Sequence, residues 1–148
     1  MLFNIVLEAI WGSIIDTWEA HGLGVKLDGD GTQQALVNHF LWADSVALVA
    51  VSATQMRQMV GMMTVTLRRA GMDLKQDSLE YLIFGVRPNQ GPQSLVCELN
   101  DTICQMAGDP SLPDSMRQSV VLPRKSDCEI LGVNFGGSQR LPCSETSN

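Results

Sequence analysis

The sequence predicts an α+β fold in which two helices pack on an antiparallel sheet and are followed by short strands. Two segments repeat apolar residues every three or four positions, as amphipathic helices do, and short apolar runs lie between and after them. The order helix, hairpins, helix, strands differs from the alternation of a parallel doubly wound sheet. At 148 residues, 45% of them hydrophobic, the chain suits one compact domain.

The first helix is predicted over Leu2–Ala20 and ends at Gly22, because glycine adopts a left-handed C-cap conformation without a Cβ clash. The second helix follows Ser52, where Gln55 completes a capping box, and ends at Gly71. The residues expected to be buried are Phe3, Leu7, Ile10, Ile14 and Trp18 in the first helix, and Met56, Met59, Val60, Met63, Leu67 and Ala70 in the second.

Two hairpins are predicted between the helices. Gly24–Leu27 is expected to be a strand that turns through a segment rich in glycine and aspartate into a second strand from Ala35 onward. The apolar runs Leu36–Trp42 and Val46–Val51 then form a hairpin with Asp44 near its tip.

The sequence after the second helix predicts short strands separated by loops that contain proline and glycine. The predicted strands are Leu79–Phe84, Ser94–Leu99, Thr102–Met106 and Ile130–Phe135. Residues 107–118, with two prolines, are predicted to be a loop, and residues 136–148 a disordered tail.

Composition and charge narrow the classes of function. Ten basic residues against sixteen acidic ones give a net charge of −6, so general electrostatic attraction to nucleic acid is not expected. The four cysteines are widely and irregularly spaced, which predicts neither a zinc site nor a disulfide and favours an intracellular protein. No apolar run approaches the roughly 20 residues that cross a bilayer, so no membrane association is expected.

Four short motifs occur along the chain in the same order as in a known family. They are Leu2-Phe3-Asn4 at the start of the first helix, Trp42-Ala43-Asp44 at the hairpin tip, Gly71-Met72-Asp73-Leu74 after the second helix, and Ile130-Leu131-Gly132-Val133 in the last strand. Together they resemble the reverse transcriptase of non-LTR (LINE-type) retrotransposons, an RNA-directed DNA polymerase. There L-F-N follows the B motif, F/Y-A-D-D is the C motif, G-L-x-L-N-x-x-K is the D motif, and Y-L-G-V/I marks a hairpin next to the thumb.

This resemblance implies that residues 1–135 are the C-terminal half of a polymerase palm, truncated at its N-terminus and followed by short thumb-proximal strands. It also implies that Asp44 is the catalytic, metal-binding carboxylate and that Leu131 and Gly132 lie near nucleic acid. The family binds Mg²⁺ between carboxylates of the A and C motifs.

The departures from the family pattern predict that the chain is inactive. Ser45 stands where the family has the second Asp of its doublet, Ser78 stands where it has the D-motif lysine, and Lys75 stands at the usual Asn position. The A motif and the fingers have no counterpart here. One carboxylate does not hold the metal pair of phosphoryl transfer, so we expect no bound Mg²⁺ and weak or lost nucleic-acid binding.

Other interpretations remain open at this point. An Asp between two strands is usually a turn residue, and His39 in an apolar run is more often a satisfied or partly exposed strand histidine than a catalyst. Arginines on an exposed helix face, here Arg57, Arg68 and Arg69, are usually solvated. The alternative function is a non-catalytic, dimerising interaction module, because loss of the A-motif strand would leave an unpaired sheet edge that favours a homo-oligomer or aggregation.

Overall fold

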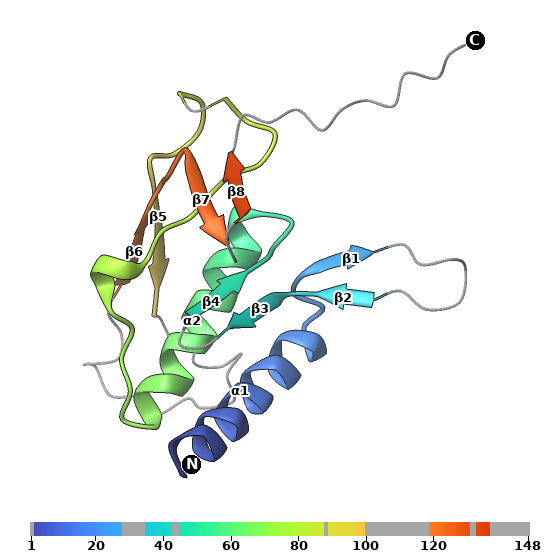
Figure 1. Cartoon of the computed structure of the whole chain (residues 1–148), viewed down its shortest axis with the longest axis vertical. Coiled ribbons are helices and arrows are strands. Elements are labelled where there is room, and N and C mark those ends of the chain that lie inside the picture. The colour runs from blue at the N-terminus through green and yellow to red at the C-terminus, as the bar shows by residue number, and fades with distance from the viewer. Residues whose placement is uncertain are drawn as a thin grey trace. The chain divides into compact units, whose positions relative to one another are not determined.

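The structure is a computed structural model that describes residues 2–27, 35–42, 45–87, 89–99, 119–130 and 133–136 (Figure 1). These residues form two α-helices, one 3₁₀ helix and eight strands that pair two by two, so the predicted α+β class is confirmed. The chain divides into two compact units. Unit 1 comprises Met1–Leu74 with Val96–Val120, and unit 2 comprises Lys75–Leu95 with Val121–Asn148.

Helix α1 spans Leu2–Ala20, as predicted, and ends in a Schellman motif. The Gly22 N–H donates to the Glu19 carbonyl and the Leu23 N–H to the Trp18 carbonyl, both at 2.9 Å. Gly22 has φ +63°, the left-handed conformation that glycine adopts without strain. Among the side chains of α1 that the structure describes, those after Val6, the buried ones are Trp11, Ile14 and Trp18.

Helix α2 spans Ala53–Arg69, and Ser52 caps its N-terminus as predicted. The Ser52 Oγ accepts a hydrogen bond from the Gln55 N–H at 3.2 Å. The second half of the capping box differs from the expectation, because Gln55 Oε1 faces the N–H groups of Val51 and Gly24, each at 3.4 Å. Gln55 therefore connects the helix start to the loop that precedes the first hairpin.

The C-terminus of α2 repeats the Schellman motif of α1. The Gly71 N–H donates to the Arg68 carbonyl and the Met72 N–H to the Leu67 carbonyl, both at 2.9 Å, with φ +76° at Gly71. Both predicted glycine stops are thus confirmed.

The centre of α2 is buried on every side rather than along one face. All residues from Met59 to Val65 are buried, whereas Met56 is half-buried and Ala70 is exposed. Helix α1 packs against α2, and the Arg57 Nε donates to the Val96 carbonyl in strand β5 (Ser94–Glu98) at 3.1 Å. Because neighbours cover more than one side, the burial exceeds what the apolar periodicity indicated.

Two antiparallel hairpins lie between the helices, as predicted, but their boundary differs from the expectation. The strands are β1 (Val25–Leu27) paired with β2 (Ala35–Val37), and β3 (His39–Trp42) paired with β4 (Ser45–Leu48). The run Leu36–Trp42 was predicted as one strand and is divided at Asn38 between the two hairpins. The Asn38 carbonyl accepts from the Val49 N–H at 2.8 Å.

The later strands agree only in part with the sequence. The elements are η1 (Gln76–Ser78), β5 (Ser94–Glu98), β6 (Ser119–Pro123), β7 (Asp127–Ile130) and β8 (Val133–Gly136). The strand predicted at Ser94–Leu99 is confirmed as β5. Ile130–Phe135 was predicted as one strand, which is wrong, because Ile130 pairs with Val133 across an antiparallel hairpin. Strand β6 was missed. The strand predicted at Thr102–Met106 and the loop at 107–118 lie outside the described residues, as do residues 137–148 of the predicted tail. Gly136, predicted to begin that tail, is the last residue of β8.

The strand predicted at Leu79–Phe84 is also wrong, because that segment makes a single parallel bridge between Tyr81 and Arg124. The Tyr81 N–H donates to the Pro123 carbonyl at 3.0 Å, and the Tyr81 carbonyl accepts from the Lys125 N–H at 2.9 Å. Among the described residues of unit 2, this bridge does not extend into a longer ladder of strand pairing. The segment is held instead by hydrogen bonds to Pro123, the last residue of β6, and to Lys125 just after it.

Arg124 forms hydrogen bonds to the loop that precedes β5 in unit 2. Its guanidinium donates to the Gln90 carbonyl and, at 3.0 Å, to the Arg87 carbonyl, while its N–H donates to the Gln93 carbonyl at 2.8 Å. A planar guanidinium presents several donors in fixed directions, which suits it to collecting carbonyls from one loop. Arg124 therefore has a structural role.

Candidate functional site

The predicted site centres on the tip of hairpin β3–β4. The strands pair from His39 with Leu48 to Trp42 with Ser45, and Trp42 is half-buried while Ser45 is exposed. Asp44, the predicted catalytic and metal-binding residue, lies outside the described residues. Trp42 and Ser45 are the described residues on either side of this tip.

The second predicted element of the site is the hairpin β7–β8. Ile130 and Val133 pair as the last register position. Leu131 and Gly132, predicted to lie near nucleic acid, are outside the described residues. The register agrees with a hairpin at this motif.

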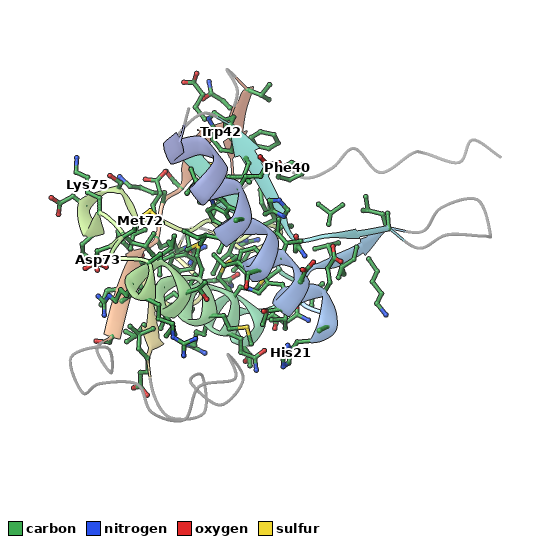
Figure 2. All side chains as sticks on the ribbon, turned by 90° about the horizontal axis from the view of Figure 1, so that it is seen from below. His21, Phe40, Trp42, Met72, Asp73 and Lys75 are labelled. Carbon is green, nitrogen blue, oxygen red and sulfur yellow. The ribbon has the colours of Figure 1, made fainter. Side chains whose placement is uncertain are left out.

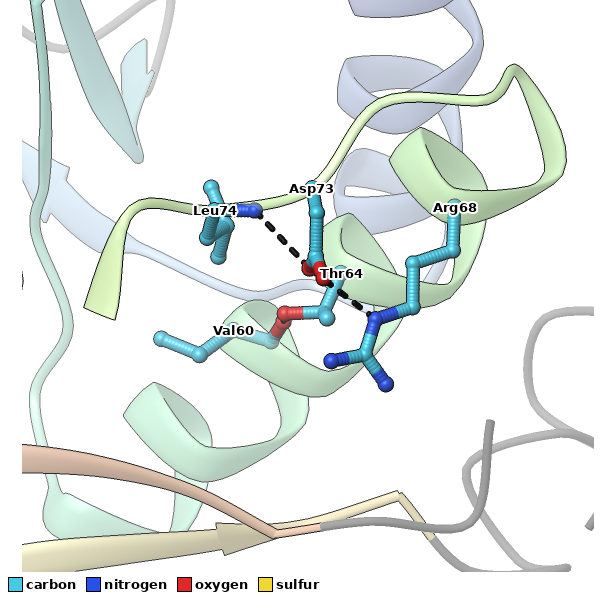
Figure 3. A network of polar contacts seen from close by, with 5 residues as sticks. All are labelled: Val60, Thr64, Arg68, Asp73 and Leu74. Carbon is cyan, nitrogen blue, oxygen red and sulfur yellow. Dashed lines mark hydrogen bonds and ion pairs between the residues drawn. The ribbon is translucent and has the colours of Figure 1, made fainter. Parts of the chain in front are cut away.

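The turn after α2 contains the sequence Gly71-Met72-Asp73-Leu74, which was compared with the D motif, and a polar network (Figure 3). Arg68 Nε lies 3.0 Å from Asp73 Oδ1, which also accepts from the Leu74 N–H at 2.9 Å. The hydrogen bond from Arg68, together with its charge and the Leu74 N–H, lowers the pKa of Asp73 against an opposing effect of desolvation. Asp73 is thus an ionised carboxylate whose charge is already paired.

Further polar groups of α2 lie near the ion pair of Arg68 and Asp73 (Figure 3). The Thr64 Oγ1 donates to the Val60 carbonyl one turn earlier in the same helix, at 2.7 Å. Arg68 Nη1 is buried with no hydrogen-bond partner among the described residues. Figure 2 labels Asp73 in the turn after α2 and Trp42 at the end of β3. The carboxylate of Asp73 accepts its hydrogen bonds from Arg68 and from the Leu74 N–H of the turn.

Two further residues that were compared with the D motif lie at the start of unit 2. Lys75 and Ser78 are exposed and flank or end η1, which is anchored by a hydrogen bond from Gln76 Nε2 to the Val121 carbonyl. An exposed hydroxyl at position 78 cannot donate a proton to pyrophosphate as an ammonium would, because its proton is far less acidic.

His39 lies beside the buried side chains of Asn38 and Trp18 in unit 1. Its Nδ1 is 2.6 Å from Asn38 Oδ1, and its ring centroid is 6.2 Å from that of Trp18. In this arrangement Nδ1 donates, because an amide oxygen only accepts. The interpretation of His39 as a satisfied, partly exposed strand histidine is confirmed.

The same region contains two buried donors without partners. Trp18 Nε1 and Asn38 Nδ2 have no hydrogen-bond partner among the described residues, although both side chains are at least 97% buried. Sequence reasoning missed this cluster. A single Asn inside an apolar run was the available signal, because a buried amide there must find its partners by tertiary packing.

Of the arginines on α2, two have defined structural partners. Arg57 bonds the Val96 carbonyl and Arg68 pairs with Asp73, and Arg69 also takes part in an interaction. The expectation that they form a merely solvated face is therefore too simple. Arg57 and Arg68 hold elements of unit 1 together.

The two described cysteines lie in surroundings that disfavour the thiolate form. Cys97 is fully buried and Cys128 is half-buried, and both are free. Burial raises the pKa of Cys97 to about 11, against a smaller lowering by the charge of Arg57. Burial and the charges of Glu80 and Asp127 raise the pKa of Cys128. Cys104 and Cys143 lie outside the described residues.

The described residues contain no group of three or more His, Cys, Asp or Glu side chains placed to hold a metal ion. The same part of the chain holds no helix long and apolar enough to span a membrane.

Comparisons with family models, curated proteins and solved structures gave no match.

Proposed function

We propose that the chain is the C-terminal half of a reverse transcriptase palm of non-LTR retrotransposon origin, and that by itself it does not catalyse nucleotidyl transfer. The observation that supports this most is the pairing of Trp42 with Ser45, which leaves two residues, Ala43 and Asp44, to join β3 to β4. A C-motif carboxylate in the family stands at such a connection.

The other motifs support the proposal by the elements on which they fall. The L-F-N motif begins α1, the G-M-D-L motif forms the Schellman turn after α2, and the I-L-G-V motif spans the connection of β7 to β8. A long α-helix, a hairpin, a second helix and a late hairpin thus follow one another in the order that the motifs imply.

The chemistry of the residues argues against activity. Two-metal phosphoryl transfer depends on several carboxylates that neutralise and hold a pair of Mg²⁺ ions. Beside Asp44 this chain has Ser45, which brings no charge, and the carboxylate of Asp73 is paired with Arg68. A single carboxylate with water ligands binds Mg²⁺ weakly, because the ion parts with its hydration shell reluctantly.

Primer extension on an RNA template tests the proposal, with Mg²⁺ and with Mn²⁺, on the full chain and on Asp44→Asn. We expect no template-dependent incorporation by either protein. Incorporation that Asp44→Asn abolishes would refute the predicted inactivity and leave the family assignment standing.

The family assignment has its own test in the nucleotide sequence immediately before the Met1 codon. We expect it to encode, in frame or after a frameshift, a strand with an A-motif Asp and a glycine-rich B motif. Unrelated coding or intergenic sequence at this position would contradict the assignment, whatever the outcome of primer extension.

A further inference from the structure

Hairpin β3–β4 differs from the other paired strands of the chain in the chemistry of its edges. Its described residues include no Lys, Arg, Asp, Glu or Pro. Each of the other three two-stranded sheets has at least one such residue, namely Lys26, Glu98, Pro123, Asp127 and Glu129. Charges, prolines and bulges are the features by which proteins prevent exposed edges from pairing. The edge of β3 has no charge or proline, and its ladder runs without a bulge.

The hydrogen-bond pattern identifies the free backbone groups of β3. In an antiparallel ladder, hydrogen-bonded and non-hydrogen-bonded pairs alternate. The Val49 N–H donates to the Asn38 carbonyl, so position 38 faces β4, as do positions 40 and 42. The N–H and carbonyl groups of His39 and Leu41 therefore point to the outer edge, where no partner strand lies among the described residues.

The side chains on this edge are apolar and exposed. Phe40 is 50% exposed and Leu41 is 44% exposed, on opposite faces of the strand. The ring of His39 lies against Trp18 of α1, so His39 and Leu41 share the face toward α1, and Phe40 and Trp42 share the other. A two-stranded ribbon with large apolar side chains exposed on both faces is marginally stable, and a third strand would cover them.

We propose that this edge pairs with the same edge of a second copy of the chain, β3 against β3 in antiparallel orientation about a two-fold axis at Phe40. In this register His39 of each copy exchanges backbone hydrogen bonds with Leu41 of the other. Phe40 then faces Phe40 of the second copy as a non-hydrogen-bonded pair, where cross-strand side chains approach most closely.

The uncharged edge and its self-complementary geometry favour a second copy over nucleic acid. Two chains of net charge −6 repel each other, and an uncharged segment is where they can meet without opposing like charges. A nucleic-acid strand would need cations along the edge, and β3–β4 has none. Antiparallel pairing of one strand with itself is self-complementary, so it forms a closed dimer rather than a filament. This inference does not depend on the proposed retrotransposon origin.

Disulfide trapping tests the proposed register. The variant Phe40→Cys would bring two thiols face to face at a Cα separation that a disulfide spans, with oxidised glutathione as the oxidant. The matched control is Leu41→Cys, at the neighbouring exposed position. In the proposed register its two thiols are offset by two residues on each strand, about 7 Å along the strand, beyond disulfide reach.

We expect Phe40→Cys to form a covalent dimer at least tenfold faster than Leu41→Cys. The rate for Leu41→Cys should equal that of the wild-type chain, which has four cysteines of its own. Equal rates for the two variants, or no covalent dimer with Phe40→Cys, would overturn the register.

Two measurements test the pairing without relying on cysteine variants. In amide hydrogen exchange of the wild-type chain, the His39 and Leu41 N–H groups should gain protection as concentration rises, whereas those of Phe40 and Trp42 should be protected throughout. In sedimentation velocity, Phe40→Lys should be a monomer and the control Leu27→Lys, at a 51% exposed position beside Lys26, should remain a dimer. A wild-type monomer at all concentrations, or equal dissociation of both variants, would overturn the proposal.

Discussion

At Gly24 a single added carbon should be strongly destabilising. Gly24 has φ +136°, and a Cβ there would lie 2.7 Å from the Val37 carbonyl oxygen and 2.9 Å from Asn38 Cβ. The oxygen belongs to the backbone of the paired strand, so it cannot move aside as a flexible side chain would. Gly71 provides the control, because it also has positive φ, at +76°, but a Cβ there meets nothing within 4 Å.

The difference between the two sites gives the expected magnitude. A left-handed backbone costs a residue with a Cβ about 1–2 kcal/mol, and overpacking adds about 1–3 kcal/mol. Gly71→Ala should therefore lower the free energy of unfolding by about 1–2 kcal/mol and Gly24→Ala by about 2–5 kcal/mol. For a domain of ordinary stability, about 5–15 kcal/mol, the second loss is large.

Urea unfolding followed by tryptophan fluorescence measures both values, because Trp18 is fully buried and reports the loss of packing in unit 1. Circular dichroism at 222 nm provides an independent probe of α1 and α2. If the two variants lose the same free energy within about 0.5 kcal/mol, the close approach of Gly24 to β2 does not exist and the reasoning fails.

Three further predictions concern a cap, an ion pair and a thiol. Ser52→Ala should lower the free energy of unfolding by about 1 kcal/mol, because it removes the acceptor of the Gln55 N–H, while Ser78→Ala at an exposed position should change it by less than about 0.5 kcal/mol. Asp73→Asn should cost no more than about 1 kcal/mol at neutral pH, since Asp73 is 65% exposed. Because its folded pKa is lowered, the contribution of Asp73 is present above 3.8 and is lost as the pH falls through the folded value. The difference between Asp73→Asn and wild type should therefore vanish in acid, and a constant difference would refute the ion pair. Cys97 should resist a thiol reagent until urea unfolds the chain. As the pH rises from 9 to 11 the unfolded thiol ionises first, so stability should fall more steeply in wild type than in Cys97→Ala.

The helices show how far local signals reach. The limits of α1, the Ser52 cap and both glycine stops follow from residues within a few positions of each other, and all were predictable. The burial of α2 from Met59 to Val65 was not, because it depends on which elements cover the helix. Periodicity identifies the face that must be buried and says nothing about neighbours on the other faces.

The strands show where local signals end. Leu36–Trp42 is one apolar run in sequence and two strands in the fold, divided at Asn38, whose carbonyl bonds Val49. Leu79–Phe84 has the composition of a strand but makes only one bridge, at Tyr81. Strand content depends on hydrogen bonds to a distant partner, which composition alone does not specify.

For the candidate site, the sequence singled out the Trp42-Ala43-Asp44 motif and predicted a hairpin around it, and the pairing of β3 with β4 agrees with that hairpin. It did not indicate that Arg68 holds Asp73, that Asn38 and Trp18 keep buried donors, or that β3 has an uncharged edge. These features arise where residues far apart in the chain meet.

The sequence by itself determined the α+β class, the positions of both helices and their ends, because these depend on periodicity and on caps within one or two turns. The tertiary structure alone decided which strands pair, where the apolar runs divide and which polar groups lie in the interior. The physical reason is that a helix satisfies its backbone hydrogen bonds locally, whereas a strand and a buried side chain must find partners elsewhere in the chain.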